Sequence, residues 1–251
     1  MEPDRISYHS SVRKVYERIK KDNITNIWDR YEAQGIGNNP DMRCPFCQAG
    51  VRCDLCSNGP CRADVSKDKR GVCGITGDGM AMRMMLLRNV MGASTYQYHT
   101  DQTIKTLRAI ANGGTPFSIK EPQKLKSFAA RLGLDTSGDD KAIAIRLCDM
   151  VEKDFHAKYD EGSKIVEILA PKERKDLWRK LGIFPGGVYG EMMFATSSCL
   201  TNVDGYYVSL ALKAMRLGIA MGYQSQIVNE FCQDIIFGVP RPHPMRVDLG
   251  V

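Results

Sequence analysis

Apolar residues recur at helical spacing near the start of the chain. Residues 10–21 carry apolar side chains every three or four positions, behind two serines that can cap a helix. A second apolar face begins near residues 23–25 and is broken before Pro40 by a stretch rich in glycine and asparagine. The pattern predicts an N-terminal segment over residues 1–42 that contains two short helices.

The helical period returns after residue 76 and continues almost to the end of the chain. Alternating apolar and polar positions, which would indicate strands, are scarce. Segments 115–121 and 185–190 are expected as hinges between helical groups. We therefore predict a mainly α-helical domain over residues 77–251, with helices at 80–90 (ended by Gly92), 101–111, 122–132, 139–155, 163–169, 172–181 and 200–237, the last broken near 218–223.

Between these parts, residues 43–76 have no helical period and are rich in glycine, aspartate, asparagine and proline, which predicts a loop segment. Such a dense group of cysteines favours metal binding over disulfides in a reducing compartment. We therefore expect the order of this loop to come from bound metal. Six of the nine cysteines of the chain lie in it, namely Cys44, Cys47, Cys53, Cys56, Cys61 and Cys73.

The last four of these cysteines are spaced C-x2-C-x4-C-x11-C, and four thiolates can hold one iron-sulfur cube. Structural zinc accepts the same four ligands, but its C-x2-C pairs are usually separated by a loop of about a dozen or more residues. The pairs that begin at Cys44 and Cys53 are closer than that. The spacing favours an iron-sulfur cluster, and a zinc-binding interaction module is the alternative.

Cys44 and Cys47 then remain without partners, and two thiolates are half of what one cluster needs. A two-fold homodimer would bring the same pair from both subunits to its axis and complete the set. The alternative is that one or both cysteines are bystanders. The sequence thus predicts a cluster shared across a dimer, as a hypothesis separate from the four-cysteine site.

Composition limits the classes of partner. The 251 residues are 43% apolar and 25% charged, which is enough to bury a core, and the formal charge is +6. The positive residues are interleaved with acidic ones, whereas nucleic-acid binding needs a basic face. No run approaches the roughly 18 apolar residues of a membrane span, and no secretory signal opens the chain, so a cytoplasmic location is expected.

Charges and rings near the cysteines offer further chemistry. Nearby cations raise the reduction potential of a cluster. Six cations lie close to the cysteines in the sequence, although each of them could equally be a solvated surface charge. His99, among polar and aromatic neighbours, is the one histidine with a plausible role in proton movement. Cys148 and Cys232 lie in apolar company and are expected as buried free thiols, and Cys199 is only slightly more suggestive. The cations concerned are Arg43, Arg52, Arg62, Lys67, Lys69 and Arg70.

Together these motifs resemble the N-terminal part of the nickel-containing, anaerobic carbon monoxide dehydrogenases, and most closely the catalytic subunit that works with acetyl-CoA synthase. The resemblance extends over essentially the whole chain. It is carried by Trp28-Asp29-Arg30-Tyr31-Glu32, by Cys53-x2-Cys56-x4-Cys61 with Gly59-Pro60-Cys61-Arg62, by Gly71-Val72-Cys73-Gly74, and by Asp234-Ile235-Ile236-Phe237-Gly238.

The resemblance implies roles for the cysteines. In this family the four-cysteine set holds a 4Fe-4S relay cluster, which assigns it to Cys53, Cys56, Cys61 and Cys73. Cys44 matches the first ligand of a cluster shared between subunits. Some members place the second ligand where this chain has Arg52, and Cys47 is then the nearby thiolate that can substitute, in a 4Fe-4S or a 2Fe-2S cluster.

The resemblance also implies the function. The family reversibly converts carbon monoxide and water to carbon dioxide, two electrons and two protons, at a nickel-iron-sulfur centre whose ligands lie in later α/β domains that are absent from this chain. No catalytic residue is therefore assigned, and the chain alone is expected to be catalytically incomplete. Of the histidines that some members place along a proton path, His99 alone matches. The expected partners are a second copy, acetyl-CoA synthase and a ferredoxin-type acceptor; a hybrid-cluster-like redox protein is the alternative.

Overall fold

The computed structural model describes residues 6–33, 50–64, 67–201 and 203–240. Two compact units divide the chain between Arg52 and Cys53. Each unit is described by itself. The predicted positions Cys44 and Cys47, together with Arg43, lie outside the described residues.

The first unit contains a pair of short helices, α1 (Ser10–Lys21) and α2 (Ile27–Ala33), as the apolar period predicts. Tyr16 is fully buried, and its ring meets the ring of Trp28 edge-on with the centroids 5.5 Å apart. Asn26 caps α2 by accepting hydrogen bonds from the backbone N–H groups of Trp28 and Asp29 at 3.1 and 3.0 Å. Aromatic packing between the two helices and the side-chain cap of α2 therefore explain why such short helices form.

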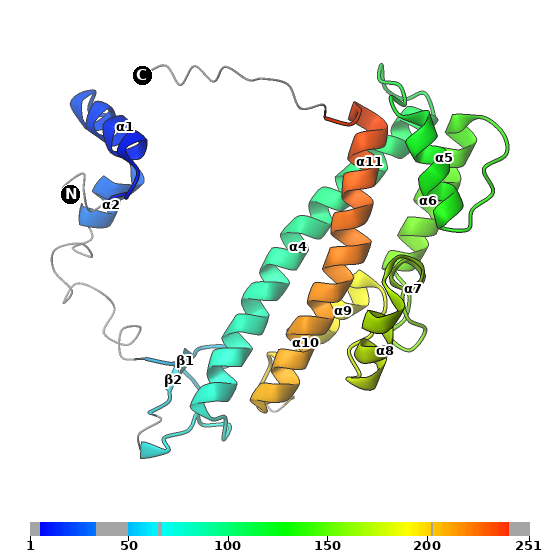
Figure 1. Cartoon of the computed structure of the whole chain (residues 1–251). Coiled ribbons are helices and arrows are strands. Elements are labelled where there is room, and N and C mark those ends of the chain that lie inside the picture. Colours follow the sequence, from blue (N-terminus) through cyan, green and yellow to red (C-terminus); the bar gives the residue numbers. More distant parts are fainter. Residues whose placement is uncertain (1–5, 34–49, 65–66, 202, 241–251) are drawn as a thin grey trace. The chain divides into compact units, whose positions relative to one another are not determined.

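The second unit is organised around one long helix, α4 (Gly77–Ala111), shown in Figure 1. The hydroxyl of Thr76 caps it by accepting from the N–H of Gly79 at 3.2 Å. The expectation that Gly92 ends a helix is wrong, because the helix continues through Gly92 for five further turns. A glycine inside a helix costs only about 1 kcal/mol, and burial of Val90, Ala93 and Gln97 on its inner face outweighs that cost.

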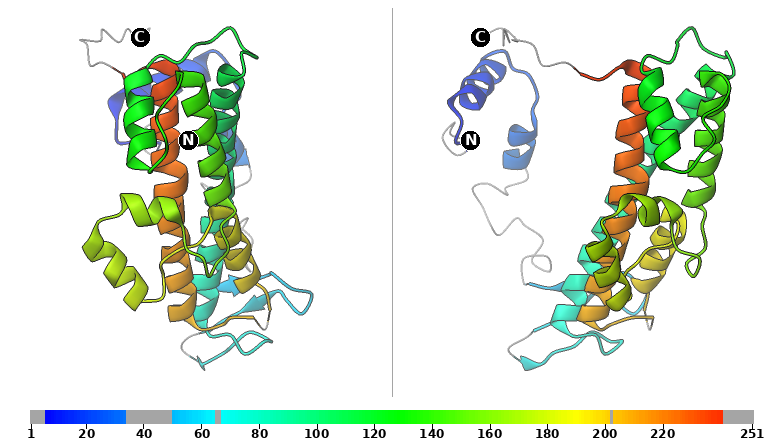
Figure 2. Two further views of the ribbon diagram at one scale, coloured as in Figure 1. Left: turned by 90° about the vertical axis from the view of Figure 1, so that its right-hand side faces the viewer. Right: turned by 45° about the vertical axis from the view of Figure 1, so that its right-hand side comes forward.

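A second long rod lies beside α4 and runs in the same direction, as both views in Figure 2 confirm. It consists of α10 (Tyr207–Ala220), the π-helical turn η4 (Met221–Ile227) and α11 (Val228–Phe237). The break expected near residues 218–223 takes the form of a change from α-helix to π-helix, because α10 ends at Ala220 and η4 begins at Met221. The chain absorbs the irregularity as a π-helix without leaving the helical path, and the rod begins at Tyr207 instead of Leu200.

Shorter helices cover the two rods. Helix α9 was not predicted, because segment 185–190 resembled a hinge; Gly187 instead stands at its N-cap position. The predicted mainly α-helical fold is confirmed in the described residues. The covering helices are α5 (Pro122–Arg131), α6 (Asp140–Phe155), α7 (Lys164–Leu169), α8 (Lys172–Lys180) and α9 (Val188–Ser198).

The apolar core of this unit has two parts that matter here. The larger cluster lies among α4, α5, α6 and α11, around residues such as Leu107 and Phe128. A smaller cluster lies among α4, α9 and α10, and Leu55 of the cysteine segment packs against it. Among the helices that the structure describes, none is long and apolar enough to cross a lipid bilayer.

Candidate metal centre

The cysteine segment folds back on itself through a minimal two-stranded sheet. Strand β1 (Arg52–Cys53) pairs with β2 (Cys61–Arg62), which brings the first and third cysteines of the four-cysteine set side by side. The turn between them passes through Gly59, whose N–H donates to the carbonyl of Cys56 at 3.1 Å. A short ladder and one tight turn thus gather three cysteines.

Gly59 lies where the three backbones converge. A Cβ atom there would come within 3.3 Å of the Cys53 carbonyl oxygen and the Cys61 nitrogen, and within 3.4 Å of the Cys56 carbonyl oxygen. Glycine avoids these contacts because it has no side chain. The close approach explains the glycine directly before Pro60 and Cys61 in the sequence.

The fourth cysteine arrives through a second glycine turn. The N–H of Gly74 donates to the carbonyl of Gly71 at 2.8 Å, and Gly74 has a φ of +83°, a conformation that favours glycine. The N–H of Val72 points at the sulfur of Cys61 from 3.4 Å. The turn therefore brings Cys73 close to Cys61. The N–H of Val72 is directed at the Cys61 sulfur, as backbone donors are in sites where thiolates bind a metal.

The buried side of the centre is formed by Arg83 of α4, which is 2% exposed. Its Nη1 lies 4.0 Å from the sulfur of Cys53 and 3.9 Å from the sulfur of Cys73. Its Nη2 donates to the carbonyl of Asp204 at 2.5 Å. One guanidinium thus connects two of the four sulfurs to the loop that precedes α10.

The surroundings of Cys56 favour its thiolate form. A hydrogen bond from the Thr201 side chain, helped by the backbone N–H groups of Asn58 and Gly59, lowers the pKa of Cys56, and the charge of Arg83 acts in the same direction. A lowered pKa favours the thiolate, which is the form that binds metal. Thr201 and Arg83 therefore both favour the thiolate form of Cys56.

The other described cysteines behave as structural thiols, as expected. Cys199 donates to the carbonyl of Ala195 at 3.4 Å, and burial raises its pKa. Burial raises the pKa of Cys148 to about 12 and also raises that of Cys232. Raised pKa values disfavour the thiolate, so these three cysteines are poor metal ligands.

The remaining predicted site residue, His99, lies exposed on α4 far along the helix from the cysteines. Its Nε2 is 2.9 Å from the amide nitrogen of Gln233, and its ring meets Tyr96 edge-on. In the described residues, no three His, Cys, Asp or Glu side chains are arranged to hold a single metal ion.

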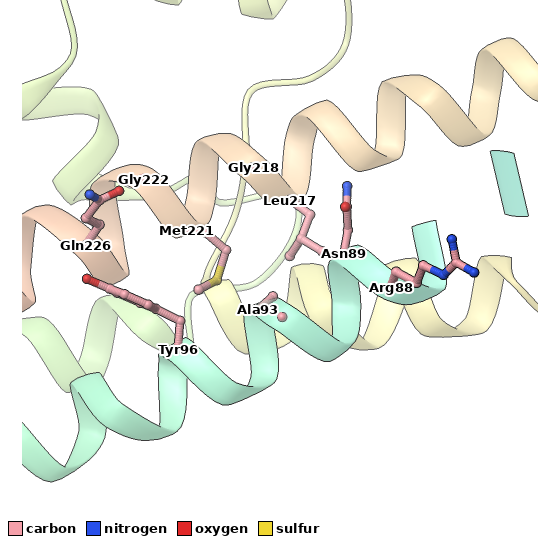
Figure 3. A pocket seen from close by; sticks show the side chains of 10 residues that line it. Arg88, Asn89, Ala93, Tyr96, Leu217, Gly218, Met221, Gly222 and Gln226 are labelled. Carbon is pink, nitrogen blue, oxygen red and sulfur yellow. The ribbon is translucent and has the colours of Figure 1, made fainter. Parts of the chain in front are cut away.

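A hollow of about 430 Å³ lies between α4, α10 and the π-helical turn, shown in Figure 3. Gly92, Gly218 and Gly222 leave space in its wall, and a Cβ atom on any of them would meet nothing within 4 Å. Its lining contains Arg88, Tyr96 and Met221 but no cysteine, histidine or carboxylate. It therefore offers no alternative to the cysteine segment as a metal centre.

Sequence reasoning missed Arg83 and Thr201. Arg83 had a detectable signal, since it is an arginine within the strongly apolar run from Met80 to Val90. Thr201 had none, because it approaches Cys56 only through the fold. Two of the cations predicted nearby form surface ion pairs, Lys67 with Asp64 at 3.6 Å and Arg70 with Asp68 at 3.5 Å.

The chain is similar in sequence to known proteins of one family. The Prismane/CO dehydrogenase family matches residues 51–251. The chain is 76% identical over 251 residues to carbon monoxide dehydrogenase 2 of Methanosarcina mazei, covering all of this chain and 40% of that protein. It is 47% identical over 249 residues to the carbon monoxide dehydrogenase of Archaeoglobus fulgidus, covering 98% of this chain and 38% of that protein.

Solved structures agree with these matches. The nickel-free carbon monoxide dehydrogenase of Thermococcus sp. AM4 superposes with a TM-score of 0.85 at 29% identity, covering 96% of this chain and 38% of that chain. Carbon monoxide dehydrogenase IV of Carboxydothermus hydrogenoformans gives 0.81 at 31% identity, covering 91% of this chain and 36% of that one. The chain thus spans about two fifths of the length of the relatives it matches.

Proposed function

The chain belongs to the Prismane/CO dehydrogenase family, and from that premise we propose that residues 50–76 form the iron-sulfur electron-relay site of a carbon monoxide dehydrogenase. The ligands are Cys53, Cys56, Cys61 and Cys73. The observation that carries the proposal is the convergence of three cysteine backbones on Gly59, with the fourth cysteine and the first sharing the Nη1 of Arg83.

The residues fit a cluster in three respects. The four thiols are free, and they belong to a segment with little core of its own. The N–H of Val72 and the guanidinium of Arg83 supply donors to sulfur, which stabilise an anionic cluster. When bound, a 4Fe-4S group supplies one-electron transfer. The chain contributes the ligands, the donors and the apolar contact of Leu55 that fixes the segment on the helices.

The wider function follows the names of the relatives. In the proposal, the complete protein oxidises carbon monoxide with water to carbon dioxide, two electrons and two protons, or runs the reverse reaction. These names favour that activity over the hybrid-cluster-like and zinc-binding alternatives. No residue described here is assigned to carbon monoxide, so the 251-residue chain alone should show no turnover with added nickel. A ferredoxin-type acceptor, acetyl-CoA synthase and a cytoplasmic location, where thiols stay reduced, belong to the same proposal.

The relay site is tested by cysteine substitution under anaerobic conditions. After reconstitution with iron and sulfide, Cys56→Ser should lose the relay cluster and retain its helical circular-dichroism signal, because the helices bury their own apolar faces. Cys148→Ala is the matched control, since it removes a cysteine that is buried away from the segment and should keep wild-type iron. Wild-type iron and sulfide content in Cys56→Ser would contradict the proposed ligand set.

The shared cluster is a separate part of the proposal and has its own test. We propose that Cys44 and Cys47 of two subunits bind one cluster at the axis of a homodimer. The double variant Cys44→Ser, Cys47→Ser should lose about two iron atoms per chain if that cluster is 4Fe-4S, or about one if it is 2Fe-2S. Iron analysis combined with sedimentation measures both the loss and the dimer. An unchanged iron content would show that the two cysteines are bystanders.

A further inference from the structure

We infer that Arg83 is the buried counter-charge of the cysteine centre and that it raises the reduction potential of the cluster held there. The inference rests on the proposed function, because it needs a cluster bound through Cys53 and Cys73. It goes beyond that function by assigning a positioning and tuning role to a residue outside the ligand set.

The first argument is the geometry of the guanidinium. Nη1 lies at 3.9 and 4.0 Å from two sulfurs, and Nη2 is fixed by the carbonyl of Asp204. Nε is buried and has no hydrogen-bond partner. The protein therefore leaves this buried side chain incompletely hydrogen-bonded, and Nη1 is the nitrogen that faces the sulfurs.

The second argument is charge. Within the described ranges 6–33, 50–64, 67–201 and 203–240, no carboxylate forms an ion pair with Arg83. The nearby carboxylate of Asp204 is engaged by Lys213 at 2.6 Å and by Ser209 at 2.6 Å. A buried cation is strongly unfavourable unless an anion compensates it. The sulfurs of Cys53 and Cys73 lie 4.0 and 3.9 Å from Nη1, so the negative charge of a cluster held there would compensate Arg83.

Another buried arginine of the same unit shows the contrast. Arg216, which is 5% exposed, donates to both carboxylate oxygens of Glu191 at 2.7 Å each. Its charge is compensated by the protein itself. Arg83 is as buried as Arg216 but faces sulfur instead of carboxylate, so its compensation depends on what the sulfurs bind.

The effect on the potential follows from charge. Four thiolates outweigh the positive charge of a 4Fe-4S core, and reduction adds one more negative charge to the site. A fixed cation in a buried place stabilises the more negative state more strongly, so it raises the reduction potential. The exposed cations of the loop act less, because water screens them; Arg70 pairs with Asp68 on the surface.

The test compares substitutions on one helix. The Cys44→Ser, Cys47→Ser variant, which keeps only the relay cluster, is reconstituted with iron and sulfide. The midpoint potential of the cluster is then measured by a redox titration monitored by electron paramagnetic resonance. Arg83→Met should shift the midpoint potential to more negative values, and Arg83→Lys, which keeps the charge, should lie closer to the parent. Arg88→Met, an exposed arginine on the same helix, is the control and should leave the potential unchanged.

The outcomes separate the two levels of the proposal. A parent chain that binds no iron and sulfide would refute the relay site itself. A fully loaded Arg83→Met with the parent potential would overturn only the role of Arg83. If Arg83→Met fails to load, Arg83→Lys decides: retention of the cluster supports the counter-charge, and equal loss in Arg83→Lys overturns it.

Discussion

The cysteine segment and the helical part of the second unit are stabilised in different ways. The described residues between 52 and 75 contribute two strands of two residues each, one isolated bridge between Asp64 and Lys69, and few buried apolar side chains. Residues 77–237 form long helices around continuous apolar clusters. Burial of apolar surface therefore accounts for the second region, whereas the first has the composition of a segment whose order depends on a ligand.

Two buried arginines, Arg83 and Arg216, show the same difference between the cysteine segment and the helical part. Arg216 is compensated by Glu191 inside the helical part, and Arg83 faces the thiols of the loop. A fold that needed only itself would pair both charges with carboxylates. The two arginines therefore differ in their partners, and this difference supports the proposal that an anionic cluster compensates Arg83.

The largest expected loss of stability comes from breaking the ion pair between Arg216 and Glu191. Arg216→Met leaves the carboxylate of Glu191 buried with its main partner removed, which should lower the free energy of unfolding by about 3–5 kcal/mol. Urea denaturation followed by circular dichroism measures the change. Arg179→Met, which removes an exposed pair with Glu167, is the control and should cost at most about 1 kcal/mol.

Arg83→Met in the metal-free chain completes this comparison. It removes a buried charge that has no carboxylate partner in the described residues, so relief of desolvation offsets the lost hydrogen bond to Asp204. We expect a smaller loss of stability than in Arg216→Met. An equal loss in both variants would show that the metal-free chain compensates the charge of Arg83 as fully as that of Arg216.

A smaller effect should appear at Asp204, whose carboxylate fixes the loop next to Arg83. Burial alone would raise the pKa of Asp204, but hydrogen bonds from Lys213, Ser209 and the N–H of Tyr206 outweigh it and lower the pKa below its ordinary value of 3.8. The carboxylate thus stabilises the fold above that pH, and the stabilisation is lost as the pH falls through the lowered pKa.

Asp204→Asn should therefore cost about 1–2 kcal/mol of unfolding free energy at pH 7, where the parent carboxylate is charged. The difference between parent and variant should shrink as the pH falls below 3.8. Urea denaturation from pH 7 to pH 3 measures it. A difference that stays constant across this range would place the effect in packing instead of charge.

Much of the fold and of the candidate site could be predicted from the sequence, because local patterns determine them. The helical period gave α1, α5 and α6 nearly at their observed bounds, and cysteine spacing selected the three cysteines whose backbones meet at Gly59. The shared-cluster cysteines Cys44 and Cys47 lie outside the described residues and remain a prediction.

The errors arise where tertiary packing decides. Gly92 has the composition of a helix end, but α4 is held on its inner face by neighbouring helices through this position. Segment 185–190 resembles a hinge because of Pro185 and two glycines, yet these residues lead into α9, where Gly187 fits against the backbone of Phe155 and Ala157. Arg83 was missed because its role depends on sulfurs that lie 10 and 30 residues away in sequence.

The central claim is that the cysteine segment binds an iron-sulfur cluster and not zinc. Anaerobic reconstitution of the Cys44→Ser, Cys47→Ser variant, followed by analysis of iron, acid-labile sulfide and zinc, tests this directly. The account predicts about four iron atoms and about four sulfides per chain, bound through Cys53, Cys56, Cys61 and Cys73. About one zinc per chain, without iron or sulfide, would contradict it.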